Sequence, residues 1–277
     1  MLNKPKSAAL INDLCGLGRC SLGVAIPIMS ALNIQTVAIP TAILSCHTGF
    51  ESYSFLDFTP YLNDYLYSLD EQNYNFDSIY TGFIGSIGQF NLIKNFIKHS
   101  NASLIFIDPV MGDDGKSYAT YTEEMCKQMK SLVSLADITT PNLTEACILT
   151  DTPYNESITA EEAIEIAHKI TDSGAKTSII TGICDKIFVY TVVYRKSDNY
   201  SYICKTKRTK IQFAGTGDIF SSLLCALIMN DVPLEKAINK SCDFVREVTQ
   251  YSEDLNTSVI DGIAFEPFLS NLKEILK

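Results

Sequence analysis

The sequence is short of positive charge. Its 277 residues include 22 lysines and arginines against 32 aspartates and glutamates, so the formal net charge is −10. A surface of this sign repels the phosphate backbone of nucleic acids and the surface of anionic membranes, and we expect neither as a partner. Any phosphate group that the chain binds must therefore be held by local geometry.

Long apolar runs are also missing. The best candidate for a membrane span, residues 22–44, is interrupted by Pro27, Asn33 and Pro40, so we read it as a helix followed by a strand. Residues 1–18 lack the apolar core that a secretory signal peptide needs. We therefore expect neither a membrane segment nor export.

Cysteine spacings typical of zinc sites and disulfide frameworks are absent. The nine cysteines are an odd number, they are spread from Cys15 to Cys242, and no two of them form a C-x-x-C pair. Disulfide scaffolds and structural zinc sites depend on such regular spacings. The pattern predicts free thiols in a reducing, cytoplasmic compartment.

Two common nucleotide-binding signatures are missing as well. The late glycine turn GTGD is not followed by the Gly-Lys-Ser/Thr of a Walker A loop, and the glycines after the first predicted strand do not fit G-x-G-x-x-G. The missing dinucleotide fingerprint weighs against a dehydrogenase. A nucleotide must be held by a different kind of glycine turn.

What the chain does have is an alternation of short β-rich runs with longer helical segments. This alternation predicts an α/β fold with a central, mostly parallel sheet and helices on both faces. The expected strands are residues 8–11, 36–39, 78–82, 103–107, 137–140 and 178–181. The expected helices are residues 20–32, 87–99, 123–135 and 160–171.

Residues 186–205 interrupt the alternation with two β-rich runs around Ser-Asp-Asn, which we read as a late antiparallel hairpin. Thr159 and Glu162 have the spacing of a capping box at the start of the helix before it. No repeat, low-complexity linker or composition shift marks a second domain. We therefore predict a single domain of residues 1–277.

The segment FAGTGDIF, residues 213–220, leads into a strongly apolar helix. Its glycines let the backbone approach an anion, the first-turn amides have no helical partners, and the helix dipole favours negative charge there. An aspartate beside a phosphate fits phosphoryl transfer, because the attacking alcohol becomes acidic as its bond to phosphorus forms. Asp218 is then the general base, and the amides of Gly215, Thr216 and Gly217 form an anion hole. The alternative is an ordinary helix start, with Thr216 as the cap and Asp218 in the first turn.

Acidic residues also follow an earlier strand, in FIDPVMGDDGKSY at residues 106–118. Ligands of open α/β sheets bind at the carboxyl ends of the strands, which puts Asp108, Asp113 and Asp114 near the expected site. These side chains would hold Mg²⁺ through water, and the glycines would let the segment move as a flap. A solvated acidic turn is the alternative.

Asn142 and Glu145 stand three residues apart before another apolar helix. This is the spacing of a capping box, and a capped helix start can still direct Glu145 toward metal-bound water. His47 is either a general base or a loop histidine satisfied by the backbone. The basic run at residues 205–210 either lies on a solvated strand surface or places one of its side chains near a bound nucleotide.

Five motifs in this order, SCHTGF, TGFIGS, DPVMGDDGKSY, TPNLTEA and GTGD, resemble those of the pyridoxal kinases of the ribokinase-like superfamily. The resemblance runs from the first strand to the helix after Asp218. It implies a ribokinase-like three-layer sandwich that forms a homodimer. It also implies ATP-dependent phosphorylation of the 5′-hydroxymethyl group of pyridoxal, pyridoxine or pyridoxamine, with Mg²⁺ as cofactor and a monovalent cation left open.

The resemblance also assigns roles to individual residues. Asp218 would be the base, surrounded by Gly215, Thr216 and Gly217. The implied ATP-binding residues are Asp113, Asn142, Glu145, Thr181, Phe213 and Thr216, of which Asp113 and Glu145 would organise the metal. The implied vitamin-binding residues are Asn12, Thr48, Phe83 and Tyr118, together with Asp218.

Two other functions remain open from the sequence. A hydroxymethylpyrimidine kinase of the same superfamily would phosphorylate a similar hydroxymethyl group on a similar ring. A non-catalytic nucleotide-binding protein would keep the glycine turn without the transfer.

Overall fold

A nine-stranded sheet forms the centre of the computed structural model, which describes residues 4–276. The strand order is β11-β10-β9-β8-β5-β4-β1-β2-β3. Strands β1, β2, β4, β5, β8 and β9 run parallel to one another, whereas β3 is antiparallel to β2, β10 to β9 and β11 to β10. The strands of this sheet are β1 (Ser7–Leu17), β2 (Gln35–Cys46), β3 (Phe55–Asp57), β4 (Ser78–Thr81), β5 (Leu104–Ile107), β8 (Ile138–Thr139), β9 (Thr177–Cys184), β10 (Phe188–Arg195) and β11 (Tyr200–Lys207).

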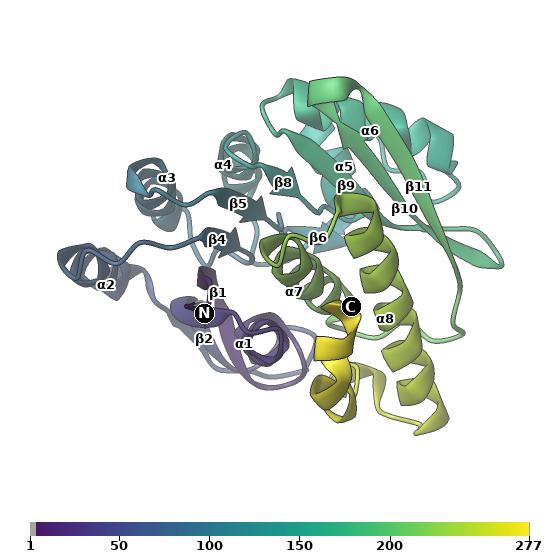
Figure 1. Cartoon of the computed structure of the whole chain (residues 1–277), viewed down its shortest axis with the longest axis horizontal. Coiled ribbons are helices and arrows are strands. Elements are labelled where there is room, and N and C mark those ends of the chain that lie inside the picture. The colour runs from purple at the N-terminus through teal and green to yellow at the C-terminus, as the bar shows by residue number, and fades with distance from the viewer. Residues whose placement is uncertain (1–3, 277) are drawn as a thin grey trace.

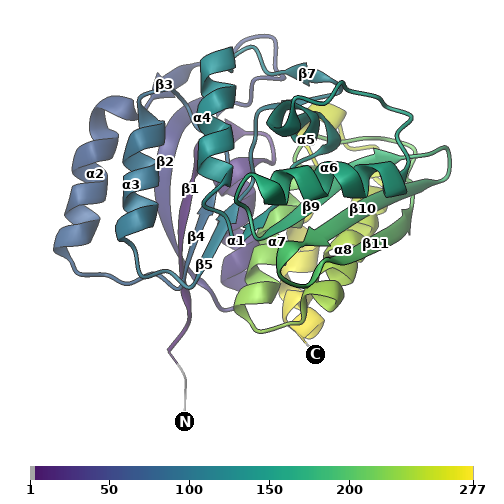
Figure 2. The same cartoon turned by 90° about the horizontal axis from the view of Figure 1, so that it is seen from above.

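Helices cover both faces of the sheet, as Figures 1 and 2 show. On one face lie α2 (Thr59–Glu71), α3 (Gln89–His99), α4 (Glu123–Val133), α5 (Leu143–Thr150) and α6 (Ala160–Asp172). On the other lie α1 (Ser21–Ala31), α7 (Thr216–Met229), α8 (Leu234–Asp254) and the 3₁₀ segment η3 (Glu266–Leu276). Two short 3₁₀ turns are η1 (Lys196–Asp198) and η2 (Val259–Asp261), and a separate two-stranded ribbon is formed by β6 (Gly112–Asp113) and β7 (Lys116–Ser117).

The apolar residues of β1 show how the sequence divides the core into two layers. Ala9 and Ile11 pack into the cluster under α2–α6, and Ala8 and Leu10 pack into the cluster under α1, α7 and α8. Successive side chains of a strand point to opposite faces, so a continuous apolar run is buried on both sides. The three-layer α/β sandwich predicted from the alternation is confirmed by this arrangement.

The outer elements differ in part from the prediction. The hairpin is confirmed as β10 and β11, and the capping box of Thr159 and Glu162 is present at the start of α6. The prediction that the second strand ends at residue 39 is wrong, because β2 continues to Cys46 and pairs there with both β1 and β3. Neither β3 nor α2 was expected. The single-domain organisation stays a prediction.

No helix among residues 4–276 combines the length and the apolar character that a bilayer span requires.

Candidate active site

A cleft of about 1360 Å³ runs along the carboxyl ends of the parallel strands. Its lining includes Asp13 from β1, Asp108 just after β5, Asn142 just after β8 and Thr181 from β9. Strand β1 pairs with β2 on one side and with β4 on the other, so the chain changes direction across the sheet beside this strand. Open α/β sheets bind their ligands at such a change of direction.

The start of α7 forms one wall of the cleft. Gly215 is the N-cap residue, with φ at 82°, and a Cβ atom added there would lie 2.0 Å from the carbonyl oxygen of Arg19. Glycine fits this position because it has no Cβ atom to clash with Arg19 and adopts a positive φ without strain. The helix begins at Thr216 and no side chain caps it, so the alternative that Thr216 serves as the cap is wrong.

The first-turn amides of α7 face this cleft. Thr216, Gly217 and Asp218 all line it, and their amides donate no hydrogen bond to another residue of the described chain. Free amides at a helix N-terminus attract anions through their dipoles and through the helix dipole. The turn therefore has the chemistry of an anion hole.

The carboxyl group of Asp218 is protonated more readily than an ordinary aspartate. Burial raises its pKa to about 7, the charge of Asp13 adds to the rise, and the Ser21 amide opposes it. Burial also raises the pKa of Asp108, to about 8, and the charge of Asp218 adds to that rise. A base with a pKa near neutrality is well suited to accept a proton from an alcohol.

The same pKa shifts fix the direction of a stability effect. The folded chain binds more protons at Asp108 and Asp218 than the unfolded chain does, because both pKa values lie above the ordinary 3.8. These two groups therefore reduce the stability of the fold as the pH rises from about 4 to about 8. Buried acids that reduce the stability of the fold are typical of functional sites, where activity requires them.

The acidic segment after β5 forms a tight ribbon at the mouth of the cleft. Asp114 and Gly115 occupy its turn with φ values of 49° and 75°, as a two-residue hairpin requires. A Cβ atom on Gly112 would lie 2.3 Å from the carbonyl oxygen of Lys116. The Gly115 amide donates to Thr144 Oγ1 at 2.9 Å, so the ribbon is docked onto α5.

Asn142 and Glu145 form the capping box predicted at the start of α5. The Glu145 carboxylate accepts hydrogen bonds from the amides of Met111 at 3.0 Å and Asn142 at 2.8 Å. The Asn142 side-chain amide donates to the carbonyl of Gly112 at 2.8 Å, and this bond holds the ribbon to the helix start. Burial, with the charge of Asp108, raises the pKa of Glu145 well above its ordinary value.

The donor set of the cleft fits Mg²⁺ that arrives with a nucleotide. Asp108, Asp113, Glu145 and Asp218 all line it, and burial together with these four charges raises the pKa of Tyr118. Within residues 4–276, however, no three His, Cys, Asp or Glu side chains are placed to hold a metal by themselves. Mg²⁺ is usually bound by one or two carboxylates, water and substrate phosphates, and this arrangement suits that mode.

The predicted vitamin-binding residues divide into two groups. Thr48, Phe83 and Tyr118 line the cleft. Asn12 is only 3 % exposed and is absent from the lining. Its Oδ1 accepts hydrogen bonds from the amides of Phe83 at 2.8 Å and Asp13 at 2.9 Å. Asn12 therefore links two residues that line the cleft without lining it itself.

His47 is satisfied on both ring nitrogens. Its Nε2 lies 2.7 Å from the carbonyl oxygen of Ile260, which can only accept, so this nitrogen carries the proton. Its Nδ1 accepts from the Gly49 amide at 3.2 Å. The structure therefore favours the backbone-satisfied histidine over the general base. The neighbouring Cys46 thiol donates to the Ser52 carbonyl at 3.3 Å and does not line the cleft.

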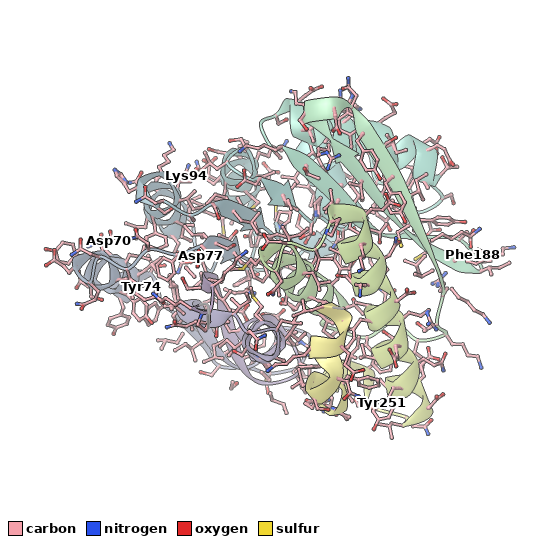
Figure 3. The ribbon with its side chains drawn as sticks, viewed as in Figure 1. Asp70, Tyr74, Asp77, Lys94, Phe188 and Tyr251 are labelled. Carbon is pink, nitrogen blue, oxygen red and sulfur yellow. The ribbon has the colours of Figure 1, made fainter. Side chains whose placement is uncertain are left out.

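The opposite wall carries the predicted nucleotide-side residues. Thr181 and Phe213 line it, together with Lys207, Arg208 and Lys210 from the basic run. Lys205 instead stacks over the ring of Phe188 at 3.7 Å, at the periphery of the molecule in Figure 3. The basic run is thus divided between the cleft and a solvated strand surface.

Asp13 and Ser21, which line the cleft, and Arg19, which lies behind Gly215, were not singled out from the sequence. The signal for Asp13 is that Asn-Asp interrupts an apolar strand, which marks a polar function at that point. The Arg19 carbonyl packs against Gly215, and the Ser21 amide donates a hydrogen bond to Asp218, so both residues act through backbone atoms. Backbone atoms leave no signature in residue types.

Known proteins share this fold and part of this sequence. A Bacteroides thetaiotaomicron protein assigned to the phosphomethylpyrimidine kinases, crystallised with pyridoxal, is 35% identical with a TM-score of 0.93, over 97% of this chain and 96% of that one. A Caenorhabditis elegans protein assigned as a pyridoxal kinase is 31% identical over 160 residues, which span 54% of this chain and 48% of that relative. The pyridoxal kinase of Leishmania donovani, solved with ADP and pyridoxamine, shares the fold at 20% identity, with a TM-score of 0.88 over 97% and 96% of the two chains.

The resemblance to pyridoxal kinases that the motifs indicated is confirmed by these relatives. The family model described as phosphomethylpyrimidine kinase matches residues 57–261, which is more than half of the chain. On the strength of that match and of the shared fold, the chain belongs to the phosphomethylpyrimidine kinase family.

Proposed function

We propose that this protein is a pyridoxal kinase, which transfers the γ-phosphoryl group of ATP to the 5′-hydroxymethyl group of a B6 vitamer. One observation carries the proposal: Asp218, with its pKa raised by burial to about 7, lies in a helix turn whose free amides face the same cleft. The proposed base, Asp218, thus lies within three residues of the backbone amides that would bind the phosphoryl oxygens.

Asp218 acts on the acceptor. Its carboxylate accepts the hydroxyl proton as the oxygen attacks phosphorus, and the proton moves late because the transition state is loose. The amides of Thr216 and Gly217 donate to the phosphoryl oxygens as negative charge spreads over them. Gly215 lets this turn pack against the Arg19 carbonyl, where a Cβ atom would clash.

ATP lies along the wall formed by Asn142, Thr181, Phe213 and the start of α7. Bound Mg²⁺ would neutralise charge on the phosphates, and Asp113 and Glu145 would hold it through water. Glu145 is suited to this outer role because both of its oxygens already accept backbone hydrogen bonds. Lys207 and Lys210 add positive potential on the same side of the cleft.

The vitamin lies against the opposite wall. Thr48 offers a hydroxyl to the ring substituents, Phe83 supplies an apolar surface, and the Tyr118 hydroxyl faces the carboxylates. Asn12 supports this wall through Phe83 rather than by touching the ring. The pyridoxal bound in the Bacteroides relative supports an acceptor of this class.

The family description favours one competing acceptor, a hydroxymethylpyrimidine. Parallel assays of ADP release with pyridoxal, pyridoxine, pyridoxamine and hydroxymethylpyrimidine separate the two functions, with mass spectrometry of the phosphate ester. We expect an ester of at least one B6 vitamer. Transfer to the pyrimidine alone would assign the chain to the competing function, and ATP binding without any ester would leave a non-catalytic nucleotide-binding protein.

The role of Asp218 is tested in the same assay. Asp218→Asn keeps the size of the side chain but removes the base, so turnover should fall by about 10² or more. ATP affinity, measured by calorimetry, should change little. Asp64→Asn on the exposed surface of α2 is the matched control, and equal rates in the two variants would remove Asp218 from the reaction.

We also propose that the protein is a cytoplasmic homodimer. Leu14, Ile43 and Leu56 are paired across β1, β2 and β3, and their side chains are 38%, 37% and 51% exposed. An apolar row at a sheet edge is suited to cover its equivalent in a second copy. Leu56→Lys should yield monomers in sedimentation, whereas Leu255→Lys, at an exposed apolar site beyond α8, should not. The nine cysteines, all unbridged, support the cytoplasmic location.

A further inference from the structure

Two thiols lie together in the vitamin-side wall of the cleft. Cys15 comes from the end of β1 and Cys20 is the N-cap residue of α1, with four residues between them. Both line the cleft and both are free. They lie on the two sides of the short turn that joins β1 to α1, and the Cys20 thiol, together with burial, raises the pKa of the Cys15 thiol.

The two thiols differ in their surroundings. Cys15 is 6% exposed and donates its S–H to Asp13 Oδ2 at 3.1 Å, whereas Cys20 is partly exposed. The Cys20 side chain also makes no capping hydrogen bond to α1. The pair therefore consists of an accessible thiol and a sheltered thiol with a proton acceptor attached.

We propose that Cys15 and Cys20 are a redox-active pair, which a hydroperoxide converts into a disulfide that slows phosphorylation of the vitamin. The activity half of this inference rests on the proposed kinase function. The formation of the disulfide does not depend on it.

The chemistry proceeds in two balanced steps. The Cys20 sulfur attacks the outer oxygen of the hydroperoxide, breaks the O–O bond and becomes a sulfenic acid, while the alcohol or water leaves. The Cys15 sulfur then attacks the Cys20 sulfur, the S–S bond forms, and the sulfenic oxygen leaves as water. The Cys15 proton passes to the Asp13 carboxylate and from there to the departing hydroxide. Two thiols are oxidised and one peroxide is reduced.

The disulfide would tie together the two ends of the turn from β1 to α1. That turn presents the Arg19 carbonyl to Gly215 and the Ser21 amide to Asp218. It also carries Asp13, whose charge raises the pKa of Asp218. A small shift of the turn therefore reaches both the anion hole and the base, because misplacement by about 1 Å is costly in such sites.

The sequence offers a direct way to map the bond. Trypsin cleaves after Arg19, so Cys15 lies in the peptide 7–19 and Cys20 in the peptide 20–94, which also contains Cys46. After treatment of the full chain with hydrogen peroxide and alkylation of the remaining thiols, mass spectrometry should find these two peptides joined. The link should persist in Cys46→Ser, vanish in Cys20→Ser and disappear on addition of dithiothreitol.

A second pair of neighbouring thiols, which does not line the vitamin-side wall, provides the matched control. Cys204 and Cys242 are both buried, between β11 and α8. Cys204→Ser should leave the peroxide response unchanged. Oxidised wild-type protein should lose at least about fivefold in rate with its vitamin and recover in dithiothreitol, whereas Cys20→Ser should keep its rate.

Each possible result decides the inference. A fully oxidised chain without the link between peptides 7–19 and 20–94, or with a link that survives in Cys20→Ser, overturns the redox pair. A reversible link with an unchanged rate overturns its effect on catalysis. If the reduced protein phosphorylates no vitamer at all, the proposed function fails, and the peptide map still decides whether the pair forms.

Discussion

The two walls of the cleft are built in opposite ways. On the side where we propose that the vitamin binds, His47 is hydrogen-bonded to Ile260 and Gly49, and Asn12 is hydrogen-bonded to Phe83 and Asp13, so hydrogen bonds fix this wall at two places. On the nucleotide side, Lys207 and Lys210 are exposed, and a Cβ atom on Gly182 would meet nothing within 4 Å. The proposed vitamin wall is thus held by side-chain hydrogen bonds, whereas the proposed nucleotide wall carries exposed basic side chains.

This difference fits the chemistry of the two ligands. A small ring with few polar groups is selected by shape and by a few fixed hydrogen bonds, which requires a rigid wall. A triphosphate is held by charge and by free amides, which tolerate an open wall. We therefore expect changes on the vitamin side to act on acceptor binding and changes on the nucleotide side to act on ATP binding.

The largest effect is expected where the two walls meet, at Gly215. In Gly215→Ala the new methyl group would clash with the Arg19 carbonyl, and φ at 82° would strain the backbone. We expect turnover to fall by about 10² or more and the free energy of unfolding to fall by about 1–3 kcal/mol. Steady-state kinetics and thermal unfolding would measure the two changes.

Gly217→Ala is the matched control for this substitution. Its Cβ atom would meet nothing within 4 Å, and its φ is not positive. The melting temperature should therefore stay at the wild-type value, and any loss of rate would report crowding of the phosphate. Equal melting temperatures in the Gly215 and Gly217 variants would mean that the close approach of Gly215 to the Arg19 carbonyl does not require a glycine.

Glu145→Gln is expected to have the next largest effect. The neutral side chain would attract Mg²⁺ and its water less, and we expect the Mg²⁺ concentration for half-maximal rate to rise by about tenfold. Glu162→Gln alters the equivalent capping box of α6, at an exposed position outside the cleft lining, and should leave the metal titration in place. A lower melting temperature with an unchanged titration in Glu145→Gln would leave that residue as a helix cap only.

The sequence predicts the nucleotide side better than the vitamin side. The capping box of Asn142 and Glu145 and the glycine turn before Asp218 are local patterns with a direct physical meaning, and the structure contains both. The vitamin wall depends on contacts between distant segments, such as His47 with Ile260. No spacing in the sequence reports such contacts.

The length of the second strand was missed for a related reason. Residues 40–46 mix proline, threonine, serine and cysteine with apolar residues, so they carry no clear strand signal. Their strand conformation comes from pairing with β1 and β3, for instance between Ile43 and Leu56. Tertiary pairing outweighs local preference in strands more readily than in helices.

A pair of smaller changes tests the division of labour between the walls directly. Thr48→Val removes a hydroxyl at the vitamin wall and should raise the KM for the vitamin by roughly fivefold, the effect of about 1 kcal/mol. Lys210→Ala removes charge at the nucleotide wall and should raise the KM for ATP about threefold, and less at high salt. Each variant should leave the other KM unchanged, and equal losses for both ligands in either variant would contradict the separation.

The smallest expected effect is a shift in pH dependence caused by Asp13. The acid limb of kcat/KM should lie near pH 7, because Asp218 is a base only when deprotonated and burial raises its pKa to about 7. The negative charge of Asp13 contributes to this rise, so Asp13→Asn should lower the pKa of Asp218 and move the limb to lower pH, by less than about one unit. Asp70→Asn, on α2 at the edge of the molecule in Figure 3, should leave the limb in place. A limb that moves to higher pH in Asp13→Asn would mean that the vitamin wall tunes the base through hydrogen bonds rather than through charge.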